Sequence, residues 1–178
     1  MQVRNPLLVV VDMQIGFINQ YSKPVIPSVL RLVKSCERWS LPIVFTKFVN
    51  KESSPFESLL GWTALRHRPE IDLHDAFVDR TDTLIEKNSY TAFTDEFERI
   101  LESQACRTLL ISGISTESCI LKTAIDAFEK EYRPVVISDA CASDQGTDVH
   151  KHALDILRVL IGKNQIMSFK ELAQHLDL

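Results

Sequence analysis

The amino-acid sequence predicts an α/β fold in which a mainly parallel β-sheet is covered by helices on both faces. Short continuous runs of Val, Ile and Leu recur along the chain, and such runs are typical of strands that are buried on both faces. Segments with helical periodicity alternate with these runs. Because parallel neighbours need a crossover between them, the alternation of six strands with helices favours a parallel sheet.

The N-terminal half holds three of the predicted strands. Residues 7–11 and 42–46 are continuous apolar runs, and 83–86 is a shorter third strand. Residues 27–40 have the apolar spacing of a helix, with a proline suited to its first turn. The segment 51–69 is irregular and is predicted to be a long excursion with one helical turn. Loops of this length in compact domains often form lids or pocket walls.

Residues 107–143 are predicted to form a strand, a helix and a second strand. The first strand, 108–111, is followed by Ser115 and Thr116, which stand where a helix N-cap belongs. The next segment has one apolar face, made of Ile120, Leu121, Ala124, Ala127 and Phe128. The second strand, 135–137, is expected to stop at the Ser-Asp pair that follows it. This order makes the segment a crossover unit of the sheet.

Three further elements complete the predicted order. Thr94 is expected to cap a helix that precedes the central unit, because two acidic residues follow it in the first turn. A helix from about residue 147 ends before Gly162, and its inward residues are predicted to be Val149, Ala153, Ile156, Leu157 and Leu160. Residues 165–168 are the sixth strand, and 170–178 a last short helix.

The composition is that of one domain covering residues 1–178. The chain is 45% hydrophobic and carries a formal net charge of −4. It has no basic run, so nucleic acid is not an expected partner. Membrane association is not expected either, since no apolar stretch approaches the roughly 20 residues of a membrane span. The N-terminus lacks a small-residue cleavage site, so we expect a cytoplasmic protein.

Three chemically versatile side chains are predicted to meet at one edge of the sheet. Asp12 ends the first strand, Lys87 ends the third, and Cys119 lies in the first turn after the fourth. Ligands of parallel sheets bind beyond the carboxyl ends of the strands. The first turn of a helix favours a thiolate, and its free N–H groups suit the oxyanion of a tetrahedral intermediate. A cysteine in such a turn is more often a buried apolar residue, but the shared strand-end placement favours catalysis.

Four segments of the chain resemble the isochorismatase-like cysteine hydrolases, which include nicotinamidases and N-carbamoylsarcosine amidase. They read VVVDMQIGF, EKNSYTAF, GISTESCILKTAIDAF and VVISDACAS. The resemblance implies a Rossmann-like, three-layer α/β/α fold with sheet order 3-2-1-4-5-6. It also implies a triad in which Cys119 is the nucleophile, Asp12 the general base and Lys87 the neighbouring cation. A cis peptide bond between Ile114 and Ser115 is implied as well.

The expected reaction is hydrolysis of a small amide, carbamoyl or ureido C–N bond through a thioester on Cys119. The oxyanion would face the backbone N–H groups of Ser115 and Cys119. One alternative keeps the fold and cleaves an isochorismate-like ether, with Arg66 and Arg68 as candidate carboxylate ligands. Bacterial isochorismatases of that type have glycine at the cysteine position, so Cys119 favours acyl chemistry. A second alternative is a non-catalytic binding or redox-sensing domain in which Cys119 is an oxidisable thiol.

The substrate is expected to be small and partly apolar, and no cofactor is expected. The predicted pocket residues are Gln14, Phe17, Phe48, Trp62, Tyr90, Ile114 and Ile120. No metal site is predicted, because nicotinamidases carry an Asp-x-His motif after the second strand and residues 46–50 contain no histidine. The segment 150–152, His-Lys-His, is interpreted as a solvated helix face because its two imidazoles diverge by about 200°.

The four cysteines show no C-x-x-C spacing, so neither a disulfide framework nor a zinc site is indicated. Cys36 and Cys106 lie in helical patterns and are expected to pack. The family resemblance implies a homo-oligomer, either a dimer or a tetramer. Apolar side chains in the irregular excursion, Phe56, Leu59, Leu60 and Trp62, are the candidate contact surface.

Overall fold

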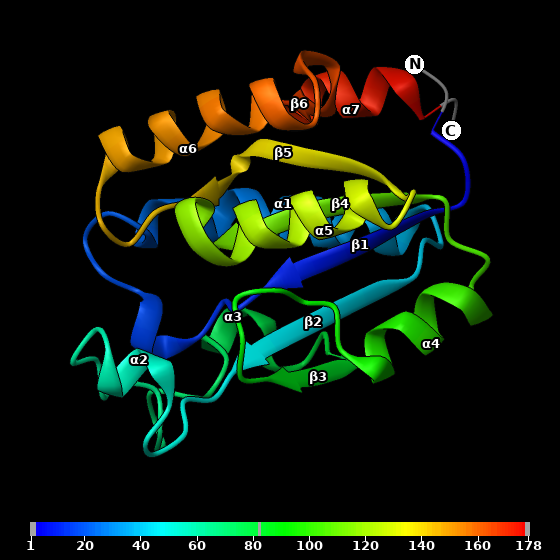
Figure 1. Ribbon diagram of the computed structural model, residues 1–178. Helices are drawn as coiled ribbons and strands as arrows, with labels where there is room; N and C mark the ends of the chain where they lie inside the picture. The colour runs from blue at the N-terminus through cyan, green and yellow to red at the C-terminus, as the bar shows by residue number, and fades with distance from the viewer. Residues whose placement is uncertain (1–2, 82, 177–178) are drawn as a thin grey trace.

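A computed structural model describes residues 3–81 and 83–176 of the chain. Within these residues six parallel strands form one sheet in the order β3-β2-β1-β4-β5-β6, as predicted (Figure 1). The strands are β1 (Pro6–Val11), β2 (Ile43–Phe48), β3 (Leu84–Lys87), β4 (Thr108–Ile114), β5 (Arg133–Ala142) and β6 (Ile166–Met167).

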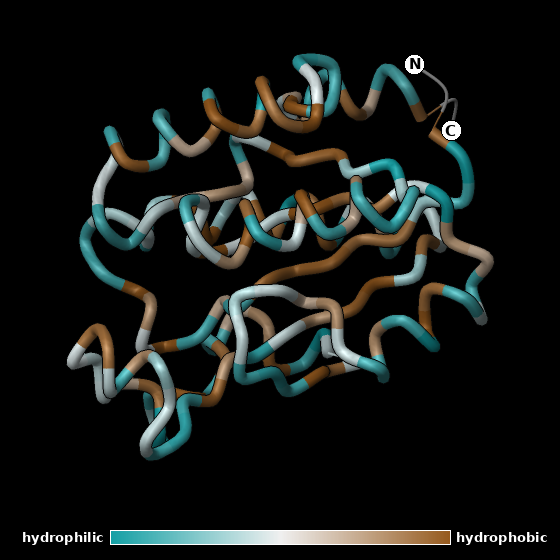
Figure 2. The backbone as a smooth tube through the Cα atoms, in the orientation of Figure 1, coloured by the Kyte–Doolittle hydropathy of each residue, from teal (hydrophilic) through white to brown (hydrophobic). Residues whose placement is uncertain are grey.

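Helices cover both faces of the sheet and give the predicted three layers. They are α1 (Ile26–Arg38), α2 (Pro55–Ser58), α3 (Asp75–Val78), α4 (Asp95–Ser103), α5 (Leu121–Glu129), α6 (Thr147–Leu160) and α7 (Phe169–His175). Apolar residues of α1, α3 and α7 pack in one core cluster, and those of α4, α5 and α6 pack in the other. In Figure 2 the hydrophobic colour follows the central strands, while the outer turns of the helices are hydrophilic. No helix among the described residues is long and apolar enough to cross a membrane.

The central strand β1 explains why the sheet has two covered faces. Leu8 and Val10 point into the core cluster of α1, whereas Leu7, Val9 and Val11 point into the cluster of α4 and α5. All five side chains are fully buried. A strand with alternate residues buried on opposite faces needs this unbroken apolar run. Hydrogen bonding to β2 on one side and β4 on the other fixes the end of β1 in place.

Gly113 lies on β4 opposite Val11, the last residue of β1. Its backbone is paired with Val11 in the parallel register and has a φ of +119°. A Cβ atom at this position would lie 2.0 Å from the Val11 carbonyl oxygen. Only glycine fits this position, because the backbone conformation disfavours a side chain and because a Cβ atom would collide with the neighbouring backbone.

Strand β5 is longer than predicted. It continues through Ser138 and Asp139 to Ala142, and its last residues pair with the end of β4. The two polar residues do not end the strand because both have partners. Ser138 Oγ donates a hydrogen bond to the Met167 carbonyl, and Asp139 Oδ1 accepts one from the backbone N–H of Phe169. The strand therefore reaches the same sheet edge as β1 and β4.

The predicted inward faces of α5 and α6 are partly wrong. Phe128, Ile156 and Leu160 were expected to point inward but are exposed, and Leu154 is buried instead. Helix α6 meets the sheet only along the stripe that contains Ala153, Leu154 and Leu157, so an apolar residue outside this stripe remains at the surface. Helix α3 was not predicted at all, whereas the irregular segment 51–69 contains one helical turn, α2, as expected.

Candidate active site

The three side chains singled out in the sequence meet at the carboxyl edge of the sheet. The ammonium Nζ of Lys87 lies 2.6 Å from Asp12 Oδ2 and 3.4 Å from Cys119 Sγ. All three residues are buried. The arrangement therefore combines a thiol, a carboxylate and a cation with little access to bulk water.

Backbone geometry and neighbouring donors hold Asp12. It follows the last residue of β1 with a φ of +49°, a left-handed conformation that aspartate tolerates better than most residues. Its backbone N–H donates to the Thr46 carbonyl at 3.2 Å, and the Thr46 hydroxyl donates to Asp12 Oδ1 at 2.7 Å. One carboxylate oxygen is thus directed by β2, and the other faces the lysine.

Lys87 is the last residue of β3 and is oriented by the loop that follows it. Its Nζ also donates to the carbonyls of Ser89 and Tyr90, at 3.0 and 3.2 Å. The ammonium lies 5.3 Å from the centre of the Phe48 ring, a distance at which a cation and an aromatic face attract. The cation consequently has several partners and cannot leave the site at low cost.

Cys119 lies in a π-helical turn, Thr116–Ile120, that precedes α5. Ser115 begins this turn after a cis peptide bond with Ile114. In a regular α-helix the Ser115 carbonyl would accept the N–H of Cys119, but here it accepts those of Ser118 and Ile120. Ser115 is the N-cap residue of this turn, as predicted, but its side chain caps no backbone N–H because its hydroxyl donates to Asp144 Oδ1.

The thiol is the protonated form at neutral pH. The pKa of Cys119 is raised to about 12, mainly by burial and also by the Asp12 carboxylate, while Lys87 opposes both effects. The expectation that the helix N-terminus would favour a thiolate is therefore wrong, because desolvation outweighs it. Burial by itself lowers the pKa of Lys87, but Asp12 and Cys119 outweigh it and the net shift is upward, so Lys87 stays charged.

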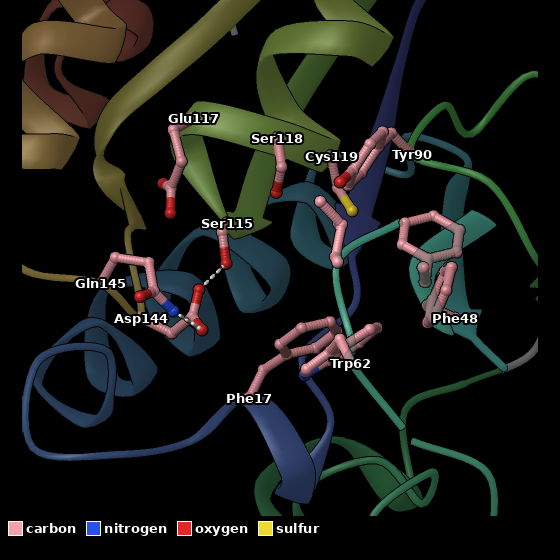
Figure 3. A pocket seen from close by; sticks show the side chains of 12 residues that line it. Phe17, Phe48, Trp62, Tyr90, Ser115, Glu117, Ser118, Cys119, Asp144 and Gln145 are labelled. Atoms are coloured by element: carbon pink, nitrogen blue, oxygen red, sulfur yellow. Dashed lines mark hydrogen bonds between the residues drawn. The ribbon is translucent and has the colours of Figure 1, made fainter. Parts of the chain in front are cut away.

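A cavity of about 360 Å³ opens onto Cys119 (Figure 3). Four predicted residues line it, namely Phe17, Phe48, Trp62 and Tyr90, together with Ser115 and Cys119. Phe56 and Leu60, which were predicted only as part of a contact surface on the excursion, also line it, and four polar lining residues were not predicted: Glu117, Ser118, Asp144 and Gln145. Aromatic rings form one wall, with the Phe17 and Trp62 centroids 6.1 Å apart and stacked.

The other three predicted pocket residues lie elsewhere. Gln14 is fully buried, and its amide Nε2 donates to the carbonyls of Phe48 and Ile71 while Oε1 accepts the Phe48 N–H. Its side chain thus connects the segment after β1 to β2 and to the excursion. Ile114 and Ile120 are fully buried in the two opposite core clusters. Their proximity in the sequence to the turn of Cys119 does not bring them to the cavity.

The missed polar residues were within reach of the same reasoning that found the triad. Glu117 and Ser118 lie in the turn that carries Cys119, so their side chains can face the same cavity. Asp144 and Gln145 follow the carboxyl end of β5, which is the same edge of the sheet. Asp144 and Gln145 were not predicted because β5 is longer than expected, so its carboxyl end was placed too early in the chain.

The histidines and arginines considered in the sequence have other partners. His150 is half-buried, with its Nδ1 2.8 Å from the Thr116 hydroxyl, so the interpretation of this segment as a solvated face holds only for the exposed His152. Arg66 pairs with Glu57 at 2.7 Å and Arg68 with Asp72 at 3.2 Å. Neither arginine is among the described residues that line the cavity.

Among the described residues, no group of three or more His, Cys, Asp and Glu side chains is placed to hold a metal ion. The remaining cysteines, Cys36, Cys106 and Cys141, are buried and unpaired. Burial raises the pKa of Cys36 to about 12 and that of Cys106 to about 11. Cys119 is the cysteine of the described chain that lines the cavity.

Comparison with known proteins gives one family. The model of the isochorismatase domain matches residues 6–167. Nicotinamidase 3 of Arabidopsis thaliana is 29% identical over 144 residues, which cover 76% of this chain and 72% of that protein. Ureidoacrylate amidohydrolase RutB of Acinetobacter baylyi is 24% identical over an alignment of 204 residues, covering 94% of this chain and 83% of that protein.

The solved structures show the same fold. The structure of N-carbamoylsarcosine amidase from Thermoplasma acidophilum superposes with a TM-score of 0.80 at 22% identity, covering 94% of this chain and 95% of that one. Coverage of curated relatives is less complete. This chain spans 64% of isochorismatase domain-containing protein 2 of Xenopus laevis, to which it is 26% identical over 148 residues that cover 82% of this chain.

Proposed function

The chain belongs to the isochorismatase family of hydrolases, and from this premise we propose that it is a cysteine hydrolase acting on the C–N bond of a small amide, carbamoyl or ureido compound. The observation that carries the proposal is the contact of Lys87 with both Asp12 and Cys119 beside a cavity with an aromatic wall. Such a site offers a nucleophile, a proton acceptor and a counter-charge within reach of one bound molecule.

The first step is attack of Cys119 Sγ on the substrate carbonyl carbon. The S–H bond breaks and its proton passes to Asp12, while the carbonyl electron pair moves onto oxygen. The raised pKa of Cys119 means that little thiolate exists beforehand, so proton transfer accompanies attack. Lys87 keeps its charge throughout and stabilises the sulfur and carboxylate as negative charge moves between them.

The oxyanion is proposed to bind the backbone N–H groups of Ser115 and Cys119. Support comes from the π-helical turn, in which the Ser115 carbonyl bonds to Ser118 and Ile120 and leaves the N–H of Cys119 without that acceptor. Donors aimed at a developing oxyanion in a desolvated site typically contribute a factor of about 10² to 10³ in rate.

Collapse of the tetrahedral intermediate breaks the C–N bond and leaves a thioester on Cys119. The departing nitrogen takes the proton from Asp12, and ammonia or an amine is released. Water then attacks the thioester carbon and gives one proton to Asp12, the C–S bond breaks, and the leaving sulfur takes that proton from Asp12. The products are the amine and a carboxylic or carbamic acid, and the enzyme returns to its starting state.

The relatives support C–N bonds over ethers as targets. The named nicotinamidase, ureidoacrylate amidohydrolase and N-carbamoylsarcosine amidase all act, by their names, on amide or ureido compounds. An isochorismate-like ether carries carboxylates, and Arg66 and Arg68 pair with acidic residues away from the cavity. We therefore propose the amide reaction alone.

The test is ammonia release from a panel of primary amides, carbamoyl compounds and ureido compounds. We expect turnover of at least one class by the wild-type protein and none above background by Cys119→Ala. Cys36→Ala is the matched control, since it removes a buried cysteine from the core cluster of α1 and should retain activity if folded. Equal rates for the wild type and Cys119→Ala would refute a cysteine mechanism.

We also propose that the protein assembles as a homo-oligomer through the excursion between β2 and β3. Leu59 and Leu60 are 80% and 64% exposed, and Leu60 also lines the cavity beside the half-buried Trp62. Apolar side chains this exposed favour a protein contact. A neighbouring subunit on this surface would help to exclude water from Cys119.

A further inference from the structure

The cavity beside Cys119 has a marked charge asymmetry. Its lining includes two acidic side chains, Glu117 and Asp144, and among the residues that the structure describes no lysine or arginine lines it. Lys87, whose ammonium contacts Cys119, is buried in its ion pair with Asp12 and does not line the cavity. A bound molecule therefore faces two carboxyl groups and has no cation opposite it on the cavity wall. Figure 3 shows both acids on the side of the cavity away from Phe48.

Asp144 makes three hydrogen bonds beside the proposed reaction centre. Its Oδ1 accepts the hydroxyl hydrogen of Ser115, the residue proposed to bind the oxyanion through its N–H. Its Oδ2 accepts the Gln145 amide at 2.8 Å, and its backbone carbonyl accepts the Asn19 amide at 2.8 Å. These neighbours are all uncharged, so none of them neutralises the carboxylate.

Glu117 leaves hydrogen-bonding capacity unused. Its Oε1 accepts the Ser143 hydroxyl at 2.8 Å, whereas Oε2 is buried and has no hydrogen-bond partner among the described residues. Burial raises the pKa of Glu117, and the neighbouring Asp144 raises it further. A buried carboxylate oxygen without a partner is costly, and a donor supplied by a ligand would remove the cost.

Aromatic side chains form the remaining wall. Phe17 stacks on Trp62 with centroids 6.1 Å apart, and Phe56 meets Tyr90 edge-on at 5.0 Å. Aromatic faces attract cations as well as methylene groups, and the attraction is larger in a desolvated site. An aromatic wall opposite two carboxyl groups has the chemistry of a site for an organic cation.

We propose that Glu117 and Asp144 are specificity-determining residues that select substrates bearing a protonated amine and reject substrates bearing a carboxylate. The inference rests on the proposed hydrolysis of a C–N bond at Cys119 and names its substrate class, a small amide or carbamoyl compound with an ammonium group at the end away from the scissile bond. A carboxylate in the same place would meet like charges in a site of low dielectric, where repulsion is strong.

The test uses three matched series of primary amides. The first is glycinamide and its longer ω-amino homologues, the second has a methyl group in place of the ammonium, and the third an ω-carboxylate. At the chain length that fits the cavity, we expect kcat/KM of the amino amide to exceed that of the methyl analogue about tenfold or more. The carboxylate analogue should fall below the methyl analogue by a similar factor.

Two substitutions test whether Glu117 and Asp144 cause the preference for amino amides over methyl amides. Asp144→Asn and Glu117→Gln keep the size and one acceptor oxygen, and each should reduce the ratio between amino and methyl substrates, with the double variant near unity. Asp155→Asn is the matched control, because its carboxylate pairs with Arg158 at the surface of α6. If Asp144→Asn lowers turnover of both substrates equally, Asp144 merely supports Ser115 and the proposal is overturned.

Binding to Cys119→Ala, measured by calorimetry, separates this inference from the proposed reaction. A preference for amino over methyl amides that Asp144→Asn removes would support cation selection even if the wild type hydrolyses none of them. Turnover by the wild type without a preference, or with a preference for carboxylates, would overturn the inference and leave the proposed reaction intact. Absence of any binding by all three series would overturn it as well.

Discussion

Asp12→Asn should lower the pKa of Cys119 and at the same time lower the rate of amide turnover. The substitution keeps the size of the side chain and removes its negative charge. In the wild type this charge is one of the causes that raise the pKa of Cys119, while Lys87 lowers it. With the charge gone, the pKa of Cys119 should fall, and the thiolate should become more abundant at neutral pH.

The size of the effect follows from the geometry. The distances from Lys87 Nζ, 2.6 Å to Asp12 Oδ2 and 3.4 Å to Cys119 Sγ, place the sulfur within about 6 Å of that oxygen. At an effective dielectric constant of about 20, a unit charge about 6 Å away contributes about 3 kcal/mol, or about two pKa units. The pKa should therefore drop from about 12 by about two units. At pH 8 the thiolate fraction would rise about a hundredfold.

The assay is the rate of alkylation by iodoacetamide, followed by intact mass across a range of pH, with peptide mapping to assign the site to Cys119. We expect Asp12→Asn to react faster than the wild type at pH 8 and yet to lose a factor of about 10² to 10⁴ in amide turnover, because the proton acceptor is gone. Thr46→Val is the matched control, since it removes the hydroxyl donor to Asp12 and keeps the charge. A slower alkylation of Asp12→Asn at every pH would refute the electrostatic reasoning, and unchanged turnover would refute the base.

Four further predictions concern the cation, the metal, the assembly and the fold. Lys87→Met should abolish turnover and lower the free energy of unfolding by about 3–5 kcal/mol, measured in urea, because a buried carboxylate loses its partner; wild-type stability would contradict this. Turnover should survive prolonged chelation, and a stoichiometric transition metal at residues 46–50 would contradict that. Light scattering should give a mass above the 20.3 kDa of one chain, with Trp62→Ala lowering both assembly and turnover; a 20.3 kDa particle would exclude the assembly. Gln14→Ala should lower the free energy of unfolding, measured in urea, by about 3 kcal/mol because its backbone hydrogen bonds are lost. A loss of activity without a loss of stability would instead indicate that Gln14 contacts the substrate.

The sequence predicted the triad positions because they depend on a rule that is local to each strand. A buried parallel strand is visible as an apolar run, and the residue after it lies at the ligand-binding edge. Asp12 and Lys87 were found in this way, and their contact in the structure needs only the predicted sheet order. The side chains that depend on how helices dock were less accessible. Phe128 and Ile156 have the right spacing for burial, but the sheet covers only part of each helix.

The acidic part of the cavity was missed for a related reason. Asp144 follows a strand that the polar residues Ser138 and Asp139 appeared to end, and the partners that let the strand continue come from β6 and α7. Gln14 was misassigned because an amide close to Asp12 in the sequence is equally suited to a substrate and to backbone groups. Its hydrogen bonds to Phe48 and Ile71 join segments that are distant in the sequence.

The contact between Gly113 and Val11 has a consequence for the mutational landscape of this protein. Because the contact joins two backbones, no side-chain exchange can compensate for a larger residue at position 113. It pairs with Val11, the last residue of β1 before Asp12, and it lies on the strand that leads into the turn of Cys119, so a substitution that separates the two strands should also move Asp12 away from Cys119. In saturation mutagenesis, nearly every substitution at Gly113 should therefore abolish activity, although glycine has no side chain that could take part in the reaction. Substitutions at positions 117 and 144 should instead change substrate preference while the fold is kept, so these two positions are the better choice for libraries that seek new substrates.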